Sequence, residues 1–82
     1  MTFEIVNFRC CRDTHTLLAT ADIQLDRQVI VCNVKLIRRK DGSLAMAMPT
    51  KKEGTRYLPE ILVVDSLLRA EMEQALVNRY TR

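Results

Sequence analysis

The alternation of apolar and polar residues predicts three strands in the first half of the chain. Residues 17–25 alternate strictly, which is typical of a strand with one buried face. Residues 28–37 are apolar on both faces at their start, and this favours a central strand. Within residues 2–11 the apolar phase changes, so we expect there either two covered faces or a bulge near Ile5.

The strand at 28–37 is expected to send alternate side chains to opposite faces of the sheet. One face is predicted to carry Ile30, Cys32, Val34 and Leu36. The other face is predicted to carry Val29, Val31, Asn33 and Lys35.

Short polar segments join these strands and introduce a fourth. Residues 13–15 are a polar break, and Asp26 with Arg27 has the length of a hairpin connection. Asp41-Gly42 is a strong hairpin signal, and it leads into a strand at 43–48 in which large apolar residues alternate with alanine. Pro49 ends that strand, because proline has no N–H to donate to a neighbour.

Positive charge follows directly on this fourth strand. Lys51 and Lys52 come where the chain leaves the sheet, so two ammonium groups are expected at a sheet end, an arrangement that suits a phosphate. Residues 53–55 are predicted to form a loop. Residues 56–64 are apolar but are interrupted by Pro59, which confines any strand to an edge or splits it. We expect the segment 57–64 to pack in a crossover or across a dimer interface.

A helix completes the predicted fold. Asp65 or Ser66 can cap its N-terminus, and it is expected to run to about Tyr80. Its apolar stripe consists of Leu68, Met72, Ala75, Leu76 and Tyr80. The fold class is therefore α+β: one domain over residues 1–82, with a small four- to five-stranded antiparallel sheet and one C-terminal helix.

The charge of the chain is polarised. Its formal net charge is +3, but residues 35–56 hold seven basic and two acidic side chains, a local charge of +5, while the rest carries −2. This distribution favours an anionic partner. The seven basic residues are Lys35, Arg38, Arg39, Lys40, Lys51, Lys52 and Arg56.

Arg38, Arg39 and Lys40 form a run that in most proteins is a solvated turn. Here a second basic cluster, Lys51 and Lys52, stands beyond the strand 43–48, so the clusters bracket one strand of roughly 17–20 Å. A nucleic acid backbone can bridge that distance and a small anion cannot.

The residue types needed for catalysis or metal binding are scarce. His15 is expected to be an exposed imidazole in a turn, and no third group orients a cysteine–histidine pair, so we predict no enzyme. Cys10 and Cys11 would point to opposite faces of a strand and cannot readily share a metal ion with Cys32. Buried or half-buried, reduced thiols are the expected state, with no metal and no cofactor.

The N-terminal residues lack the pattern of a signal peptide, and no apolar run approaches the length of a membrane span. We therefore expect a cytoplasmic protein without a membrane partner.

The run Ala-Met-Pro-Thr-Lys-Lys at 47–52 resembles the core motif of the stage V sporulation protein G (SpoVG, septation regulator) family. The order of features around it is also similar, with Ile-x-Leu-Asp at 23–26 and a C-terminal helix ending near Tyr80; the likeness covers roughly residues 15–80. The resemblance implies a small antiparallel sheet with a C-terminal helix, and homodimers formed through strands.

The same resemblance implies a DNA contact on the helix. The family carries an Arg-Gly-Lys stretch there, and Arg69 matches its arginine, close to the free N–H groups of the first turn. Ala70 and Glu71 stand where glycine and lysine would, and a carboxylate beside a phosphate weakens binding. The chain also has Cys32-Asn33 in place of a His-Asp pair and 61–63 in place of Ala-His-Pro.

Two functions remain open from the sequence. The first is a homodimeric regulator that binds the phosphate backbone of DNA or RNA, with no small-molecule substrate. Its proposed contacts are Arg38, Arg39, Lys40, Lys51, Lys52, Arg56 and Arg69. The second is a protein-interaction module that docks a partner through a sheet edge and the apolar segment 58–64.

Overall fold

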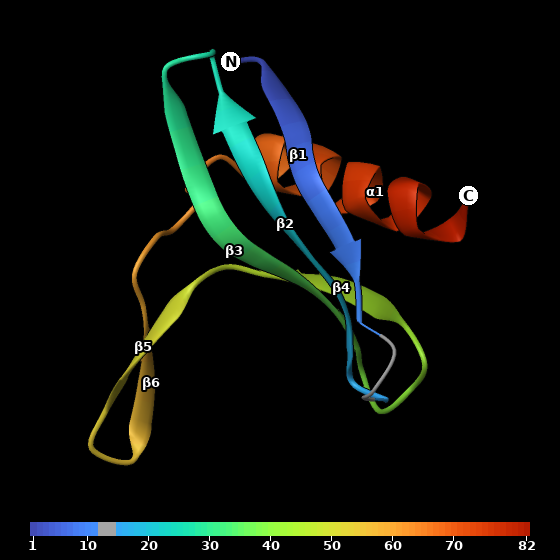
Figure 1. The fold of residues 1–82 in the computed structure, drawn as a ribbon. Helices are drawn as coiled ribbons and strands as arrows, with labels where there is room; N and C mark the ends of the chain where they lie inside the picture. The colour runs from blue at the N-terminus through green and yellow to red at the C-terminus, as the bar shows by residue number, and fades with distance from the viewer. Residues whose placement is uncertain (12–14) are drawn as a thin grey trace.

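The computed structural model describes residues 1–11 and 15–82, and it confirms an α+β fold (Figure 1). An antiparallel sheet with the strand order β1-β2-β3-β4 consists of β1 (Phe3–Cys10), β2 (Leu17–Leu25), β3 (Val29–Arg38) and β4 (Leu44–Ala47). Two more strands, β5 (Thr50–Glu53) and β6 (Arg56–Pro59), form a separate two-stranded sheet. The helix α1 (Ser66–Thr81) follows. Of the predicted polar break, Asp13 and Thr14 lie outside the described residues.

The sequence predictions hold for most element positions. The strand predicted at 17–25 has those bounds, and β3 is central, between β2 and β4. The chain leaves the main sheet after Ala47, and Lys51 and Lys52 then lie in β5; of the predicted loop 53–55, Glu53 ends β5 and residues 54–55 form the turn. Because β6 belongs to a two-stranded sheet it is an edge strand, one of the two outcomes predicted from Pro59, which is its last residue.

Two bulges at asparagine set which side chains of β1 and β3 face the core. Asn7 and Asn33 have left-handed φ values of 52° and 61°, and the pairing register with β2 shifts beside each of them. Asparagine tolerates this conformation better than most residues. The bulge in β1 therefore lies at Asn7, between Val6 and Arg9, slightly later than the predicted position near Ile5.

Asp22, on β2 between these strands, binds both bulges. Its carboxylate accepts hydrogen bonds from the side-chain amide of Asn7 at 3.0 Å and from the backbone N–H of Asn33 at 3.1 Å. The Asn7 bond, followed by the Asn33 bond and the charge of Arg9, holds the pKa of Asp22 below its ordinary value of 3.8. One carboxylate thus fixes the geometry of both neighbouring strands.

The bulge at Asn33 corrects the predicted faces of β3. Val31, Val34 and Leu36 are buried in the core, whereas Ile30 and Cys32 are exposed. The prediction that Ile30 and Cys32 share a face with Val34 was wrong, because the extra residue of a bulge reverses the alternation. The register shift at this bulge thus places Val31, Val34 and Leu36 on the same side of the sheet.

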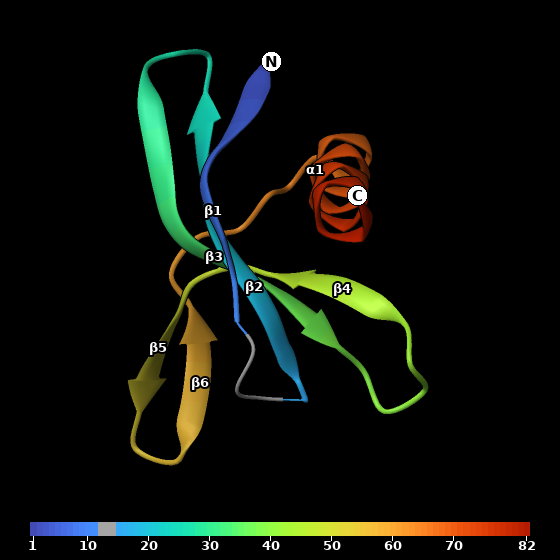
Figure 2. The same cartoon turned by 45° about the vertical axis from the view of Figure 1, so that its right-hand side comes forward.

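The helix covers this apolar side of the sheet (Figure 2). Asp65 caps its N-terminus, accepting bonds from the N–H groups of Leu67 and Leu68 at 2.9 and 3.1 Å. Met72 and Leu76 are fully buried against Ile23 and the other core residues of the sheet. The helix contacts both edge strands, β4 and β1.

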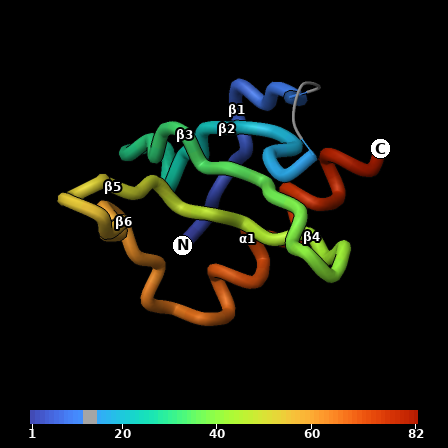
Figure 3. The backbone as a smooth tube through the Cα atoms, turned by 90° about the horizontal axis from the view of Figure 1, so that it is seen from below, coloured from blue at the N-terminus to red at the C-terminus, as the bar shows by residue number. Residues whose placement is uncertain are grey.

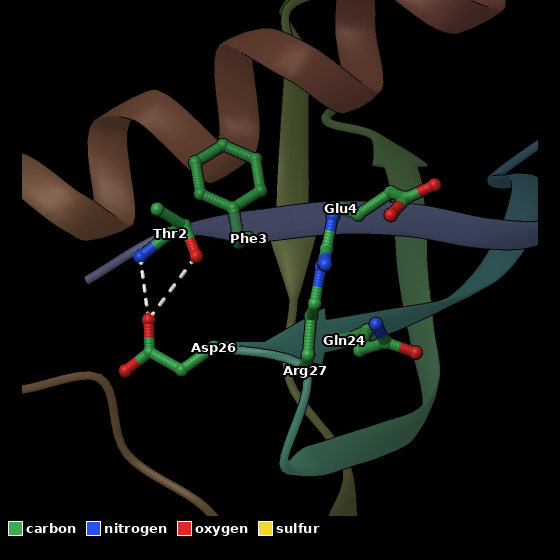
Figure 4. Close-up of a pocket in the computed structure, with 6 residues that line it drawn as sticks. All are labelled: Thr2, Phe3, Glu4, Gln24, Asp26 and Arg27. Atoms are coloured by element: carbon green, nitrogen blue, oxygen red, sulfur yellow. Dashed lines mark hydrogen bonds between the residues drawn. The ribbon is translucent and has the colours of Figure 1, made fainter.

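The β2–β3 turn lies at the end of the sheet near the N-terminus (Figure 4). Asp26 and Arg27 both have positive φ, 48° and 58°, which is the geometry of a type I′ hairpin turn formed here without glycine. The Asp26 carboxylate accepts bonds from the N–H and hydroxyl of Thr2 at 2.7 and 3.2 Å. Asp26 therefore ties the start of β1 to this turn.

Replacing Asn33 tests the bulge. Asn33→Ala should lower the free energy of unfolding by roughly 1–2 kcal/mol, because alanine is strained at a left-handed φ. Asn33→Gly should cost much less, since glycine adopts this conformation freely and keeps the N–H bonded to Asp22. Chemical denaturation of the three proteins measures the difference, and equal stability of the alanine and glycine variants would contradict a strained bulge.

Candidate nucleic-acid interface

The β5–β6 hairpin projects from the body of the protein and carries three of the predicted basic contacts (Figures 1 and 2). Lys51, Lys52 and Arg56 are all exposed, and within the hairpin only Leu58 is partly covered. Its two-residue turn contains Gly54 with a φ of 64°. The structure therefore presents these cations on a narrow ribbon.

The basic side chains of the hairpin lie on both of its faces. Lys51 pairs with Leu58 and Lys52 with Tyr57, and Glu53 pairs with Arg56. Because alternate residues of a strand point to opposite faces, Lys51 and Arg56 share one face and Lys52 occupies the other. The two lysines therefore do not form one patch, although they are adjacent in the sequence.

Lys52 also contacts an exposed aromatic ring. Its ammonium group stands 5.9 Å from the ring centroid of Tyr57, within the range of a cation–π interaction, and Tyr57 is 68% exposed. The sequence analysis did not assign Tyr57 to the site. The signal that could have found it is the antiparallel pairing across the short Gly54-Thr55 turn.

The turn between β3 and β4 holds the other basic run. Arg38, Arg39 and Lys40 are exposed, and the backbone of Arg39 bonds to that of Ser43 and of Gly42 at 2.8 and 2.9 Å. The carboxylate of Asp41 accepts bonds from the Ser43 hydroxyl at 2.6 Å and from its N–H at 2.9 Å. The turn is thus braced by its own side chains.

The Ser43 hydroxyl, with the Ser43 N–H and the charge of Arg39 as further causes, holds the pKa of Asp41 below its ordinary value of 3.8. Asp41 therefore stays ionised within the basic run and offsets one positive charge there.

Both basic regions lie at the same end of the molecule. Figure 1 shows the β3–β4 turn and the β5–β6 hairpin at the lower end, and the β2–β3 turn at the upper end. Figure 3, which views the protein from below, shows that the hairpin and the β3–β4 turn extend to opposite sides, with β4 running between them. The two regions could therefore contact one extended polyanion.

Arg69 has a different environment from the other six predicted contacts. It is half-buried, and its guanidinium donates a hydrogen bond to the backbone carbonyl of Met46 at 3.2 Å. It also lines an open groove of about 360 Å³ beside the base of the hairpin, together with Thr50, Pro59 and the segment 61–63. One of its donors is therefore already used inside the protein.

Glu73 completes a clamp on β4 that sequence analysis missed. The N–H of Met46 donates to the Glu73 carboxylate at 2.9 Å, so Glu73 and Arg69 occupy both backbone groups of one edge residue. A neighbouring strand would bond these groups in the same way. The signal in the sequence was the Arg69–Glu73 spacing of four, which puts both side chains on one face of the helix.

The apolar segment before the helix is largely uncovered. Leu62 and Val64 are 70% and 92% exposed, and Ile61 is 36% exposed, while Val63 packs against the core. Within residues 1–11 and 15–82, no other segment of the chain covers Leu62 and Val64.

The cysteines differ from the prediction. Cys10 and Cys32 are exposed and Cys11 is half-buried, so the expectation of buried or half-buried thiols was wrong for two of them. Cys32 is exposed because it precedes the Asn33 bulge. His15 is exposed, as predicted.

The described residues contain neither a metal-binding cluster nor a membrane-spanning helix. Within residues 1–11 and 15–82, no group of three histidine, cysteine or acidic side chains could hold a metal ion. No helix in this part of the chain is long and apolar enough to cross a membrane.

Comparisons with known proteins agree with the resemblance seen in the sequence. The SpoVG family model matches residues 1–82. A Finegoldia magna protein named "Putative septation protein SpoVG" is 32% identical over 65 residues, which are 78% of this chain and 59% of that protein. The chain thus spans less than two thirds of the length of this relative.

Removing the Glu73 carboxylate should release the edge of β4. In Glu73→Ala we expect faster hydrogen exchange at the Met46 amide and a loss of about 1.5–3 kcal/mol of stability, the usual contribution of a hydrogen bond to a charged acceptor. Glu71→Ala is the matched control, because it removes an exposed carboxylate from the same helix. Unchanged exchange at Met46 in Glu73→Ala would show that the clamp has no effect on this edge.

Acid titration tests the brace in the β3–β4 turn. Because the pKa of Asp41 is lowered in the folded protein, its contribution to stability is present above pH 3.8 and is lost as the pH falls through the lowered value. Ser43→Ala should raise the pKa of Asp41 and reduce this acid dependence. NMR titration of the carboxyl groups measures the pKa of Asp41 in both proteins. The pKa of Asp22 is the internal control and should not change.

Proposed function

The chain belongs to the SpoVG family, and on that basis we propose that it is a regulatory protein that binds the phosphate backbone of nucleic acid as a homodimer. The septation role in the name of its Finegoldia magna relative forms part of this proposal. We further propose that it acts in the cytoplasm, where its free cysteines would stay reduced.

The observation that carries the proposal is the placement of the excess positive charge. Residues 35–56 hold a charge of +5, and six basic side chains of this region are exposed on two projecting segments at one end of the protein. Such a distribution raises the local concentration of a polyanion and supports binding through several phosphates. The six are Arg38, Arg39, Lys40, Lys51, Lys52 and Arg56, and Arg69 adds a seventh, half-buried charge near the base of the hairpin.

The aromatic residues favour backbone contact over base stacking. Phe3 and Phe8 pack against the core, as does Tyr80, which leaves Tyr57 as the one aromatic ring exposed among the described residues. Recognition of a single strand by stacking uses several exposed rings. The proposed binding is therefore mainly electrostatic and should depend strongly on salt.

Homodimer formation is supported by a hairpin with few contacts to the rest of the chain and by exposed apolar residues beside it. A two-stranded hairpin is only marginally stable when it packs against nothing, and β5 and β6 make their main contacts with each other. Leu62 and Val64 expose apolar surface next to it. A second copy of the chain could cover Leu62 and Val64 and support the base of the hairpin at Thr50 and Pro59, which leaves the faces that carry Lys51, Lys52 and Arg56 open.

The second candidate function is a protein-interaction module that uses the apolar segment 58–64. The exposure of Leu62 and Val64 favours it. Strand addition to β4 is disfavoured, because the clamp already occupies the backbone groups of Met46. Under this alternative, Leu62→Ser with Val64→Ser would abolish partner binding, whereas the lysine variants described next would not affect it.

Replacing the hairpin lysines tests nucleic-acid binding. Affinity for an oligonucleotide should fall steeply with salt, and Lys51→Ala with Lys52→Ala should reduce the slope of log affinity against log salt by about 1.8 for a duplex or about 1.4 for a single strand, if each lysine neutralises one phosphate. Fluorescence anisotropy at several salt concentrations measures the slopes, and light scattering reports the oligomeric state.

Arg27→Asn is the control for this experiment. Arg27 lies in the β2–β3 turn at the opposite end of the sheet, and asparagine tolerates its left-handed backbone. The control should bind with unchanged slope. Salt-independent binding, or no binding at low ionic strength, would reject the proposed function.

A further inference from the structure

We propose that the β5–β6 hairpin enters the major groove of double-stranded DNA, with basic side chains directed at the phosphates of both groove walls. This inference rests on the proposed function and adds to it the form of nucleic acid that is bound and the element that enters it. It arises from the shape of the hairpin and from the distribution of its charges.

The first argument is the position of the cations on the ribbon. Lys51 and Arg56 lie on one face of the hairpin and Lys52 on the other, by the observed pairing register. A flat polyanion lying against the hairpin would meet only one of these faces. A groove has phosphates along both walls, so a ribbon inside it brings both faces into contact with phosphate.

The second argument is size. Four residues per strand at about 3.3 Å each give a ribbon about 13 Å long, and two strands about 4.8 Å apart make it narrow. The major groove of B-form DNA is about 12 Å wide and about 8.5 Å deep, and it admits a two-stranded ribbon. The hairpin is thus long enough to reach the floor of the groove while its base stays outside.

The third argument is the acidic residue near the tip. Glu53 is the one carboxylate in the hairpin, next to the turn at Gly54 and Thr55, and it is exposed. Beside phosphates this carboxylate would weaken binding. In an inserted hairpin the turn faces the base edges, where a carboxylate can accept a hydrogen bond from the amino group of cytosine. By the pairing register Glu53 shares its face with Lys51 and Arg56, so insertion suits this carboxylate because it lies next to the turn, the part of the hairpin nearest to the base edges.

The same geometry excludes double-stranded RNA as the preferred ligand. The major groove of A-form RNA is deep and narrow, and side chains do not reach its base edges. The hairpin would meet such a duplex only from outside, with one face. We therefore expect a preference for DNA duplex over RNA duplex of the same sequence.

The experiment compares three duplexes of one sequence by fluorescence anisotropy with the full chain at fixed salt. They are plain DNA, RNA, and DNA whose cytosines carry glucosylated 5-hydroxymethyl groups, which fill the major groove. Plain DNA should bind at least about tenfold more tightly than either of the others, a difference of about 1.4 kcal/mol. Netropsin, which occupies the minor groove, should not displace the protein.

Single substitutions test the two-sided contact. Lys51→Ala and Lys52→Ala should each weaken binding to plain DNA and each reduce the salt slope by about 0.9, because each lysine faces one wall. Arg27→Asn should change neither. If only one of the two lysines contributes, the hairpin lies flat and the insertion is wrong.

The outcomes separate this inference from the function on which it rests. Equal binding to plain DNA, RNA and groove-filled DNA, with salt dependence retained, would overturn insertion and leave nucleic-acid binding in place. Absence of binding to all three would overturn both. Tighter binding to plain DNA, lost when the groove is filled, supports insertion.

Discussion

The fold depends on one carboxylate that holds two strained strands in place. Asp22 accepts bonds from Asn7 and Asn33, the two residues at which β1 and β3 bulge through a left-handed conformation. Each bulge reverses the side-chain alternation, and in β3 this brings Val31 to the same side as Val34 and Leu36. Without the reversal, the sheet would divide its apolar side chains between two faces, and one helix covers only one of them.

The position of the basic segments follows from this arrangement. Because the apolar side chains gather under α1, the helix lies across the sheet and reaches β4 at its edge, where Arg69 and Glu73 bind the backbone of Met46. This clamp fixes β4 although it has a partner strand on one side only. The basic turn and the basic hairpin are attached to the two ends of β4, so their separation is set by a strand that is held on both sides.

The sequence predicted the elements well and their details less well. Strict alternation and a capping aspartate are local signals, and they located β2 and the start of α1. The bulge in β1 was signalled by a change of apolar phase, but the bulge in β3 was not, because the apolar run of β3 reads equally well in either phase; the faces of Ile30 and Cys32 were therefore assigned wrongly. The partners of Arg69 and Lys52 depend on which segments meet in space, and neither the clamp nor the Tyr57 contact follows from local pattern.

The helix of this chain departs from the family motif, and the contacts of Arg69 agree with that departure. The resemblance directs attention to an Arg-Gly-Lys stretch on the helix, but here Arg69 is bound to Met46 and an exposed Glu71 stands where the lysine would be. Both changes make this part of the helix less attractive to a phosphate, since one cation is partly occupied and the other is replaced by an anion. The hairpin has no such restriction: its three cations are exposed, and its single carboxylate lies near the tip. The proposed contact with nucleic acid is therefore assigned mainly to the hairpin, and the helix end is assigned to holding β4.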